Sequence, residues 1–185
     1  MLPSEKRYEE FAYVLDYIPR GRSSIIKGRE GAIVQALGED RLTILELLAA
    51  EGEDFETGEK LRIGREGRAK IQSVFGKLAY EDLTSEAKSQ LLSVCETIVK
   101  SNEARYVAYF NELQPLTPRL HGLELIPGVG KTFMKAIIEM REKQPFTSFA
   151  DIQTRVGLRE PAKDVAKRIA EELSGASRVN IFVKK

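Results

Sequence analysis

The feature that most constrains the fold of this chain is a bend rich in proline and glycine at residues 126–130, which read Ile-Pro-Gly-Val-Gly. Pro127 cannot continue a helix through its own nitrogen, and it biases the preceding residue away from helical angles. Gly128 and Gly130 have no side chain, so the chain can turn sharply there, and the apolar valine between them is expected in a core. From Lys131 onward apolar residues recur at helical spacing, which predicts an amphipathic helix directly after the bend.

A glycine bend at the start of a helix can bind an anion. The first N–H groups of a helix have no acceptor within the helix, and they lie at the positive end of its dipole. A phosphate can accept those N–H groups, and a lysine adds a positive charge beside them. The residues predicted to bind a nucleic-acid backbone here are Gly128, Val129, Gly130, Lys131, Thr132 and Lys135. The alternative is a corner between two helices in which the glycines serve only the tight turn.

The segment resembles a helix-hairpin-helix motif, which many DNA repair and recombination proteins use to hold a nucleic-acid backbone without reading its sequence. The resemblance rests on Leu-Ile-Pro-Gly-Val-Gly-Lys at 125–131 and on the apolar residues 136–138. Residues 146–152 resemble the connector between two such hairpins, so a tandem over roughly 119–174 is implied. In the second copy, which turns at 155–159, only Gly157 stands where two glycines are expected, and packing is the alternative to phosphate binding there.

The same resemblance implies a monovalent cation that bridges to phosphate. Backbone carbonyls of the first hairpin often hold this ion in the family, and by position they are those of Glu124, Ile126 and Val129. No other cofactor is expected.

Composition narrows the class of protein. The chain has 185 residues, of which 42% are apolar, enough for one large or two small domains, and its formal net charge is only +1. A strongly basic nucleic-acid binder is therefore excluded, and attraction to phosphate has to come from local groups of charges. Cys95 is the one cysteine and falls on an apolar helical stripe, which indicates a buried thiol and a reducing, cytoplasmic location.

Other signals argue against a membrane partner and a zinc site. No apolar run approaches the roughly 20 residues that cross a bilayer. His121, the only histidine, lies just before the bend on an expected helix and has no cysteine or histidine near it in the sequence. Neither a transmembrane segment nor a zinc site is therefore expected.

Residues 1–80 predict a small antiparallel barrel. Alternating apolar residues and glycine-bearing turns indicate five short strands, at 8–18, 32–36, 42–48, 60–63 and 68–75. Their order and the basic loops between them are similar to an oligonucleotide-binding OB fold.

Basic residues of this region cluster at 20–29 and 60–70. The candidates for binding a nucleic-acid backbone are Arg20, Arg22, Lys27, Arg29, Arg65 and Arg68. If both clusters share one face, Tyr13 or Tyr17 could stack on a base there. The alternative places these aromatic side chains in the core and the charges on a solvated rim.

The rest of the chain is predicted to be mostly helical. Apolar stripes at 87–99 and 106–113, interrupted at 101–102, form a helical connector over 81–117. The hairpin domain follows at 118–175, and residues 176–185 alternate enough for a closing strand that returns to the barrel. The predicted fold class is therefore α+β, with an OB-like β-barrel followed by an all-α tandem hairpin domain.

Taken whole, the chain resembles an uncharacterised archaeal family, the domain of unknown function numbered six-five-five. The carriers of this resemblance are residues 13–21, the bend at 125–131 and the terminal Ile-Phe-Val at 181–183. It implies an OB-like barrel, a helix-hairpin-helix domain and binding of nucleic acid or RNA, with no reaction.

Three functions can be weighed from the sequence. The first is a non-catalytic nucleic-acid binder with little sequence specificity, for RNA or DNA. The second is a protein-interaction or assembly module built on the hairpin domain. An enzyme is not expected, because the acidic residues show no recognisable spacing and the single cysteine and histidine lie in separate segments. A phosphate loop of the Walker type is also excluded, since Leu125 stands where its first glycine belongs.

Overall fold

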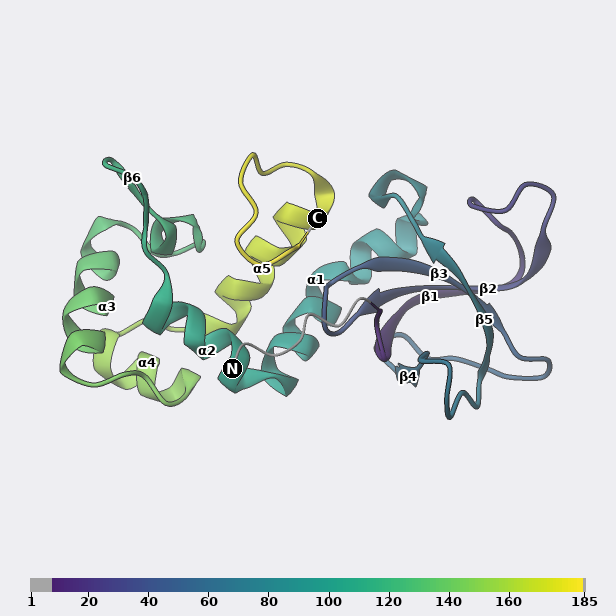
Figure 1. Cartoon of the computed structure of the whole chain (residues 1–185), viewed down its shortest axis with the longest axis horizontal. Coiled ribbons are helices and arrows are strands. Elements are labelled where there is room, and N and C mark those ends of the chain that lie inside the picture. Colours follow the sequence, from purple (N-terminus) through teal and green to yellow (C-terminus); the bar gives the residue numbers. More distant parts are fainter. Residues whose placement is uncertain (1–7, 185) are drawn as a thin grey trace. The chain divides into compact units, whose positions relative to one another are not determined.

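A computed structural model describes residues 8–184, and in it the chain divides into two compact units (Figure 1). The first unit holds the residues up to Val94, with Leu173–Gly175 and the chain end from Val183. The second holds Cys95–Glu172 and Ala176–Phe182. Two of the boundaries fall within helices, between Val94 and Cys95 and between Glu172 and Leu173.

The first unit is built on a curled five-stranded antiparallel sheet. Its strands are β1 (Phe11–Arg22), β2 (Glu30–Gly38), β3 (Ile44–Ala49), β4 (Lys60–Arg62) and β5 (Ile71–Lys77). They lie in the order β4-β1-β2-β3-β5, so the sheet is a half-barrel whose edges are β4 and β5. All five predicted strands are confirmed. The first is longer than expected, because Pro19–Arg22 of the predicted basic loop continue β1.

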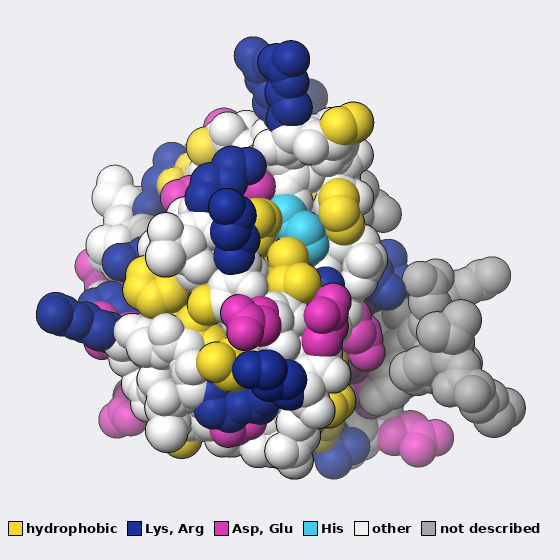
Figure 2. Space-filling view, turned by 90° about the vertical axis from the view of Figure 1, so that its left-hand side faces the viewer, with side chains coloured by type: hydrophobic (Ala, Val, Ile, Leu, Met, Phe, Trp, Pro, Cys, Tyr) yellow, Lys and Arg dark blue, Asp and Glu magenta, His cyan; other side chains and the backbone are white. Residues whose placement is uncertain are grey.

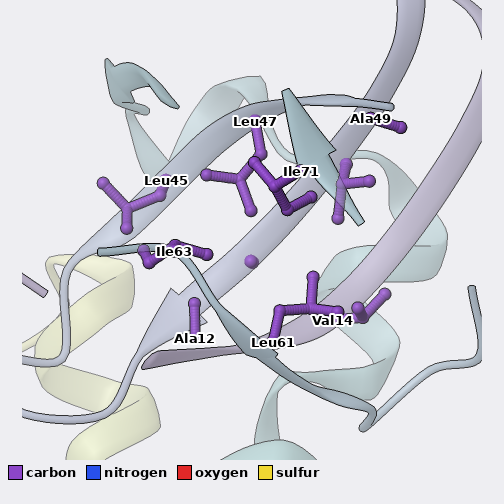
Figure 3. Close-up of a cluster of buried hydrophobic side chains, with 10 residues drawn as sticks. Ala12, Val14, Leu45, Leu47, Ala49, Leu61, Ile63 and Ile71 are labelled. Carbon is purple, nitrogen blue, oxygen red and sulfur yellow. The ribbon is translucent and has the colours of Figure 1, made fainter. Parts of the chain in front are cut away.

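Apolar side chains fill the inner face of the half-barrel (Figure 3). They come from alternating positions of the strands and include Ala12, Val14, Val34, Ala36, Leu45, Leu47 and Leu61. Burying this face accounts for the alternation seen in the sequence, since successive side chains of a strand point to opposite faces.

The outer face of β2 is buried as well. Ile33, Gln35 and Leu37 alternate with the inner residues and are all at most 5% exposed. The Gln35 side chain accepts the Thr84 N–H at 3.0 Å and donates to the Asp82 carbonyl at 3.2 Å, so the segment that leads into the first helix lies against this face. Thr84 also donates its hydroxyl to Asp16 of β1 at 2.7 Å.

The helices begin and end close to their predicted positions. The 3-10 turn η1 (Tyr80–Asp82) precedes α1 (Ser85–Ser101) and α2 (Glu103–Glu112), and the predicted break falls at Asn102. The remaining helices are α3 (Lys131–Lys143), α4 (Phe149–Val156) and α5 (Pro161–Ser174). Ser148 caps α4 by accepting the Asp151 N–H at 2.9 Å, and Gly157 ends α4 at a φ of 91°.

The segment before the bend differs from its prediction. His121 was expected on a helix, but it ends a two-stranded hairpin of β6 (Pro115–Thr117) and β7 (Leu120–His121). The 3-10 turn η2 (Gly122–Leu125) then leads into the bend. Prolines at 115 and 118 favour extended and turn angles over a helix, which is why the hairpin forms here.

The predicted closing strand is also wrong. Residues 176–184 form no strand, and in the described part of the chain the sheet ends at β4 and β5. Phe182 is 2% exposed, and its ring centroid lies 4.6 Å from that of Tyr109 on α2. Glu172 of α5 accepts the N–H groups of Ile181 and Phe182, each at 3.0 Å, so this segment is bound to the second unit by a buried carboxylate.

No helix in residues 8–184 is long and apolar enough to cross a bilayer.

Candidate nucleic-acid interface

The predicted bend lies between η2 and α3. Gly128 turns the chain at a φ of 85°, a left-handed angle that favours glycine. Val129 is 4% exposed and its N–H is bonded to the Ile126 carbonyl at 3.0 Å, so this residue anchors the bend in the core. Gly128, Gly130, Lys131 and Thr132 are exposed around it. The prediction that the valine of the bend lies in a core is confirmed.

Gly130 is a glycine that the fold does not require. It is the N-cap of α3 with φ −91° and ψ −169°, angles that any residue adopts, and a Cβ added there would meet no atom within 4 Å. No side chain caps the first turn of α3, and its first intrahelical bond runs from the Met134 N–H to the Gly130 carbonyl. The N–H groups of residues 131–133 therefore begin the helix with no side chain over them.

Lys131 is less available than the sequence suggested. Its Nζ lies 2.9 Å from Glu124 Oε1 and donates to the Arg119 carbonyl at 3.0 Å. The other oxygen of Glu124 accepts the His121 N–H at 2.8 Å, and His121 Nδ1 accepts the Leu123 N–H at 3.1 Å. These bonds form a capping box at the start of η2, and they place the Glu124 carboxylate beside Lys131.

The cap shifts two pKa values in the same direction. The His121 N–H and then Lys131 hold the pKa of Glu124 below its usual value. Burial, together with the nearby Arg141, lowers the pKa of His121, which keeps the imidazole neutral and its Nδ1 free to accept a hydrogen bond.

A second carboxylate lies close to the bend. A Cβ added at Gly128 would stand 3.2 Å from Oδ2 of Asp164 on α5. Burial raises the pKa of Asp164 above its usual value. Its carboxylate would oppose an anion that approached from the Gly128 side, so the Gly130 side is the better approach to the helix.

Basic side chains on this end of the second unit do not form one continuous patch. Figure 2 shows the face that carries the single histidine, with Lys and Arg side chains in separate groups between hydrophobic and acidic ones. Lys135 is exposed on α3 and makes no ion pair with the residues described. The cations predicted for the bend are thus few and dispersed.

The carbonyls named for a cation are partly engaged. The Ile126 carbonyl already accepts the Val129 N–H, which leaves it one lone pair. Glu124 is half-buried and Val129 is buried at the same turn. The three residues are brought together by η2 and the bend, as their sequence positions required.

Arg155, in the segment predicted to turn as a second hairpin, makes several structural contacts. Arg155 of α4 donates to the carbonyls of Met140 and Gln144 at 2.7 Å each, so it caps the end of α3. It also pairs with Asp151 at 3.1 Å and lies over the ring of Phe146. These contacts give Arg155 a role in packing α4 against the end of α3.

The first basic cluster lies at the end of β1, which carries Arg20 and Arg22, and on the loop to β2, which carries Lys27 and Arg29. Arg20, Lys27 and Arg29 are exposed, and none of them forms an ion pair with the described residues. Arg22 pairs with Glu30 at 3.1 Å, but both are well exposed, so water and salt screen the pair. The base of the loop is fixed by the buried Glu46, which accepts the Ser24 N–H.

The second basic cluster serves mainly the fold. Arg68 donates from Nε to the carbonyls of Ile63 and Gly64, at 2.8 and 3.1 Å, and so holds the loop between β4 and β5. Lys70 pairs with Glu59 at 3.0 Å. Arg65 is exposed on the same loop and makes no ion pair with a described residue. Of the two arginines predicted here, only Arg65 is available to a ligand.

The tyrosines proposed for stacking are not free. Tyr13 is 3% exposed, and its hydroxyl donates to Glu39 at 3.2 Å. Tyr17 is half-buried against Phe55, and its hydroxyl donates to the Glu53 carbonyl. The prediction of Tyr13 as a stacking residue is wrong. Tyr13 is paired with Leu37 of β2 and shares its outer face of the sheet, which is buried there.

A cavity at the open edge of the half-barrel was not foreseen. It has a volume of about 990 Å³ and is lined by residues of β3, β5, the end of β4 and the loop that carries Arg65. Tyr8 and Lys77 also line it. Sequence patterns show which residues form strands, but they do not show that β4 and β5 do not pair with each other, and the cavity depends on that gap.

Comparison with known proteins places the chain in a family. Residues 8–184 match the sequence pattern of DUF655, a family of proteins of unknown function. An uncharacterised protein of Methanocaldococcus jannaschii is 42% identical over 181 residues, which cover 97% of this chain and 82% of that protein. The crystal structure of Af1531 from Archaeoglobus fulgidus, assigned to the same family, is similar with a TM-score of 0.83 and 39% identity, over 95% of this chain and 100% of that one. The protein therefore belongs to the DUF655 family, as residues 13–21, 125–131 and 181–183 led us to expect.

Proposed function

We propose that this protein is a non-catalytic nucleic-acid-binding protein that holds the sugar-phosphate backbone with little sequence specificity. The observation that carries the proposal is Gly130, because neither its backbone angles nor its surroundings require a glycine. Because Gly130 has no side chain, the first N–H groups of α3 are left uncovered. A phosphate oxygen is a suitable acceptor for them.

The bend and the helices around it support the interpretation of this unit as a helix-hairpin-helix domain. An exposed, glycine-flanked turn with a buried valine leads directly into α3, and α4 and α5 follow as a second helical pair. In this reading the carbonyls of Glu124, Ile126 and Val129 hold a monovalent cation beside the phosphate. No other cofactor is proposed.

The half-barrel supports a second point of contact. A five-stranded, partly open antiparallel barrel is the OB architecture, in which the loops β1–β2 and β4–β5 contact oligonucleotides. These are the loops that carry Lys27, Arg29 and Arg65 as exposed cations. Contacts to a few phosphates predict modest affinity that falls steeply with salt.

Two observations favour a protein-interaction module instead. Glu124 and Asp164 place two carboxylates near the bend, and Leu116 on the β6–β7 hairpin is 44% exposed. An exposed leucine on a projecting hairpin suits a protein partner. This alternative predicts an interaction that survives nuclease treatment and is lost in Leu116→Asp but kept in Gly130→Asp.

Fluorescence anisotropy with labelled duplex DNA, single-stranded DNA and RNA tests the proposal directly. Binding is expected at about 50 mM salt and should weaken progressively toward about 200 mM. An absence of binding to all three nucleic acids at low salt would refute the function.

A further inference from the structure

The cavity between the two sheet edges is large enough for a ligand. Its volume of about 990 Å³ lies at the upper end of the range of small-molecule sites, roughly 300–1,000 Å³. It forms because β4 has only three residues and pairs with β1 alone, while β5 pairs with β3 alone. Each strand therefore turns one edge of its backbone, with N–H and C=O groups, toward the gap.

The lining combines an apolar floor with hydroxyls and cations. Leu45, Ile63 and Val74 contribute the apolar part, and Thr43 and Ser73 contribute hydroxyls. Arg65 and Lys77 are exposed at the same cavity, and neither forms an ion pair among residues 8–184. A ligand with an anionic group and a flat apolar body matches this combination.

The acidic residues of the lining do not neutralise its positive charge. The cavity is lined by five basic and three acidic side chains. Glu9 is 8% exposed, and its carboxylate already accepts the N–H groups of Asp40 and Arg41 at 2.8 and 2.7 Å. Burial raises the pKa of Glu9 above its usual value, against the effect of these backbone hydrogen bonds. The positive charges therefore dominate the cavity.

An exposed aromatic side chain lies at the cavity. Tyr8 lines it and is 77% exposed, the largest exposed fraction among the large apolar side chains described. An exposed ring of this kind is a platform on which a base can stack, whatever its identity.

The usual oligonucleotide face of a small barrel is closed in this protein. That face is formed by strands 2 and 3. Here Ile33, Gln35 and Leu37 on β2 are buried, and Gln35 is bonded to Thr84 and Asp82. A strand that contacts this unit therefore has to use the loops and the open edge.

We propose that the cavity between β4 and β5 seats a nucleotide of a single-stranded nucleic acid, with its base on Tyr8 and its phosphate between Arg65 and Lys77. This proposal rests on the proposed function and specifies its ligand. Bases in a duplex are stacked inside the helix, so their faces cannot reach an aromatic platform, whereas those of a single strand can. RNA and DNA single strands share this chemistry.

Anisotropy titrations of the full chain separate the outcomes. The probes are labelled oligouridylate and oligothymidylate of about 12 nucleotides, with RNA and DNA duplexes of the same length. The expected result is single-strand binding at least about tenfold tighter than duplex binding, weakened about tenfold by Tyr8→Ala and by Arg65→Glu. The two single strands compared with each other show whether the ribose 2′-hydroxyl contributes.

Lys143→Glu serves as the matched control, because this exposed lysine lies on α3 and the variant changes the net charge by the same amount as Arg65→Glu. Thermal unfolding of each variant confirms that the fold is intact, which the exposure of Tyr8 and Arg65 favours. Equal affinity for single strands and duplexes, or no effect of the Tyr8 and Arg65 variants, would overturn the cavity proposal and leave the binding function standing. If no nucleic acid binds at all, both proposals are refuted.

Discussion

The ammonium group of Lys131 lies 2.9 Å from Oε1 of Glu124, in the turn that precedes its own helix. The lysine that the sequence offers to a phosphate therefore already has a carboxylate partner. Both side chains are within reach of solvent, with 62% of the lysine side chain and 12% of the glutamate side chain exposed. A phosphate at the bend competes with this ion pair, so we expect Lys131 to contribute less than the N–H groups of α3.

Replacing Lys131 by methionine tests that expectation. Affinity for nucleic acid should fall for all sequences alike, by about three- to tenfold at low salt, and the slope of log affinity against log salt should decrease by about one. Because the lysine side chain of this pair is largely exposed, the free energy of unfolding should change by less than about 1 kcal/mol. Lys143→Met on the same helix is the control. An equal effect of both variants would show that Lys131 has no special position.

Replacing Asp164 by asparagine should strengthen binding. Its carboxylate stands beside Gly128, where it repels an approaching phosphate, and asparagine keeps the shape without the charge. Burial raises the pKa of Asp164, so its contribution to stability is present at low pH and is lost as pH rises through that pKa. The variant should therefore be at least as stable as the parent near pH 7. Glu160→Gln is the matched control, because this exposed glutamate directly precedes α5 and the variant removes the same charge. Weaker binding by Asp164→Asn would place the ligand elsewhere.

Stability should decrease in two stages as the solution is acidified. The pKa of His121 is lowered, so its contribution is complete above its usual value of 6.5 and is lost as pH falls through the folded-state pKa. The pKa of Glu124 is lowered from 4.5, so its contribution is lost at a lower pH, as that carboxylate becomes protonated.

Thermal unfolding between about pH 7 and pH 3, with NMR titration of the single imidazole, measures both stages. In Glu124→Gln the lower stage should become smaller while the upper stage remains. An imidazole pKa above 6.5 would contradict the hydrogen bond that His121 accepts from Leu123.

The buried chain end makes a prediction about stability alone. Phe182 packs against Tyr109 and Tyr106, and its N–H is held by Glu172. Phe182→Ala should lower the free energy of unfolding by about 3–5 kcal/mol, the usual cost of removing a buried phenylalanine. Val179→Ala, three residues earlier and 43% exposed, should change it by less than about 0.5 kcal/mol. A small effect of Phe182→Ala in chemical denaturation would contradict the packing described.

Local patterns predicted most of the fold. Alternation of apolar residues located all five strands, and apolar residues at helical spacing located α1, α2 and α3. The bend was also predictable, because proline, two glycines and one valine restrict the backbone within five residues. The two failures came where local signals compete, at the β6–β7 hairpin before the bend and in the apolar chain end, which packs by one phenylalanine instead of pairing as a strand.

The site was less predictable, because it depends on which distant residues meet. Asp164 reaches Gly128 from another helix. Arg68 is bonded to the Ile63 carbonyl, and Lys70 is paired with Glu59. No spacing in the sequence distinguishes these from the free Arg65. The cavity beside Arg65 likewise results from strand pairing, which the period of a single strand does not reveal.

The central claim is that the uncovered start of α3 binds phosphate, and Gly130→Asp tests it most directly. Aspartate is a better N-cap than glycine by a few tenths of a kcal/mol, and nothing lies within 4 Å to obstruct it, so the fold should be as stable as the parent or slightly more so. Its carboxylate should occupy the N–H groups that a phosphate needs, while Gly130→Ala adds only a methyl group and is the control. We predict that Gly130→Asp weakens nucleic-acid binding at least about tenfold at low salt. Unchanged affinity in a correctly folded Gly130→Asp protein would contradict the claim.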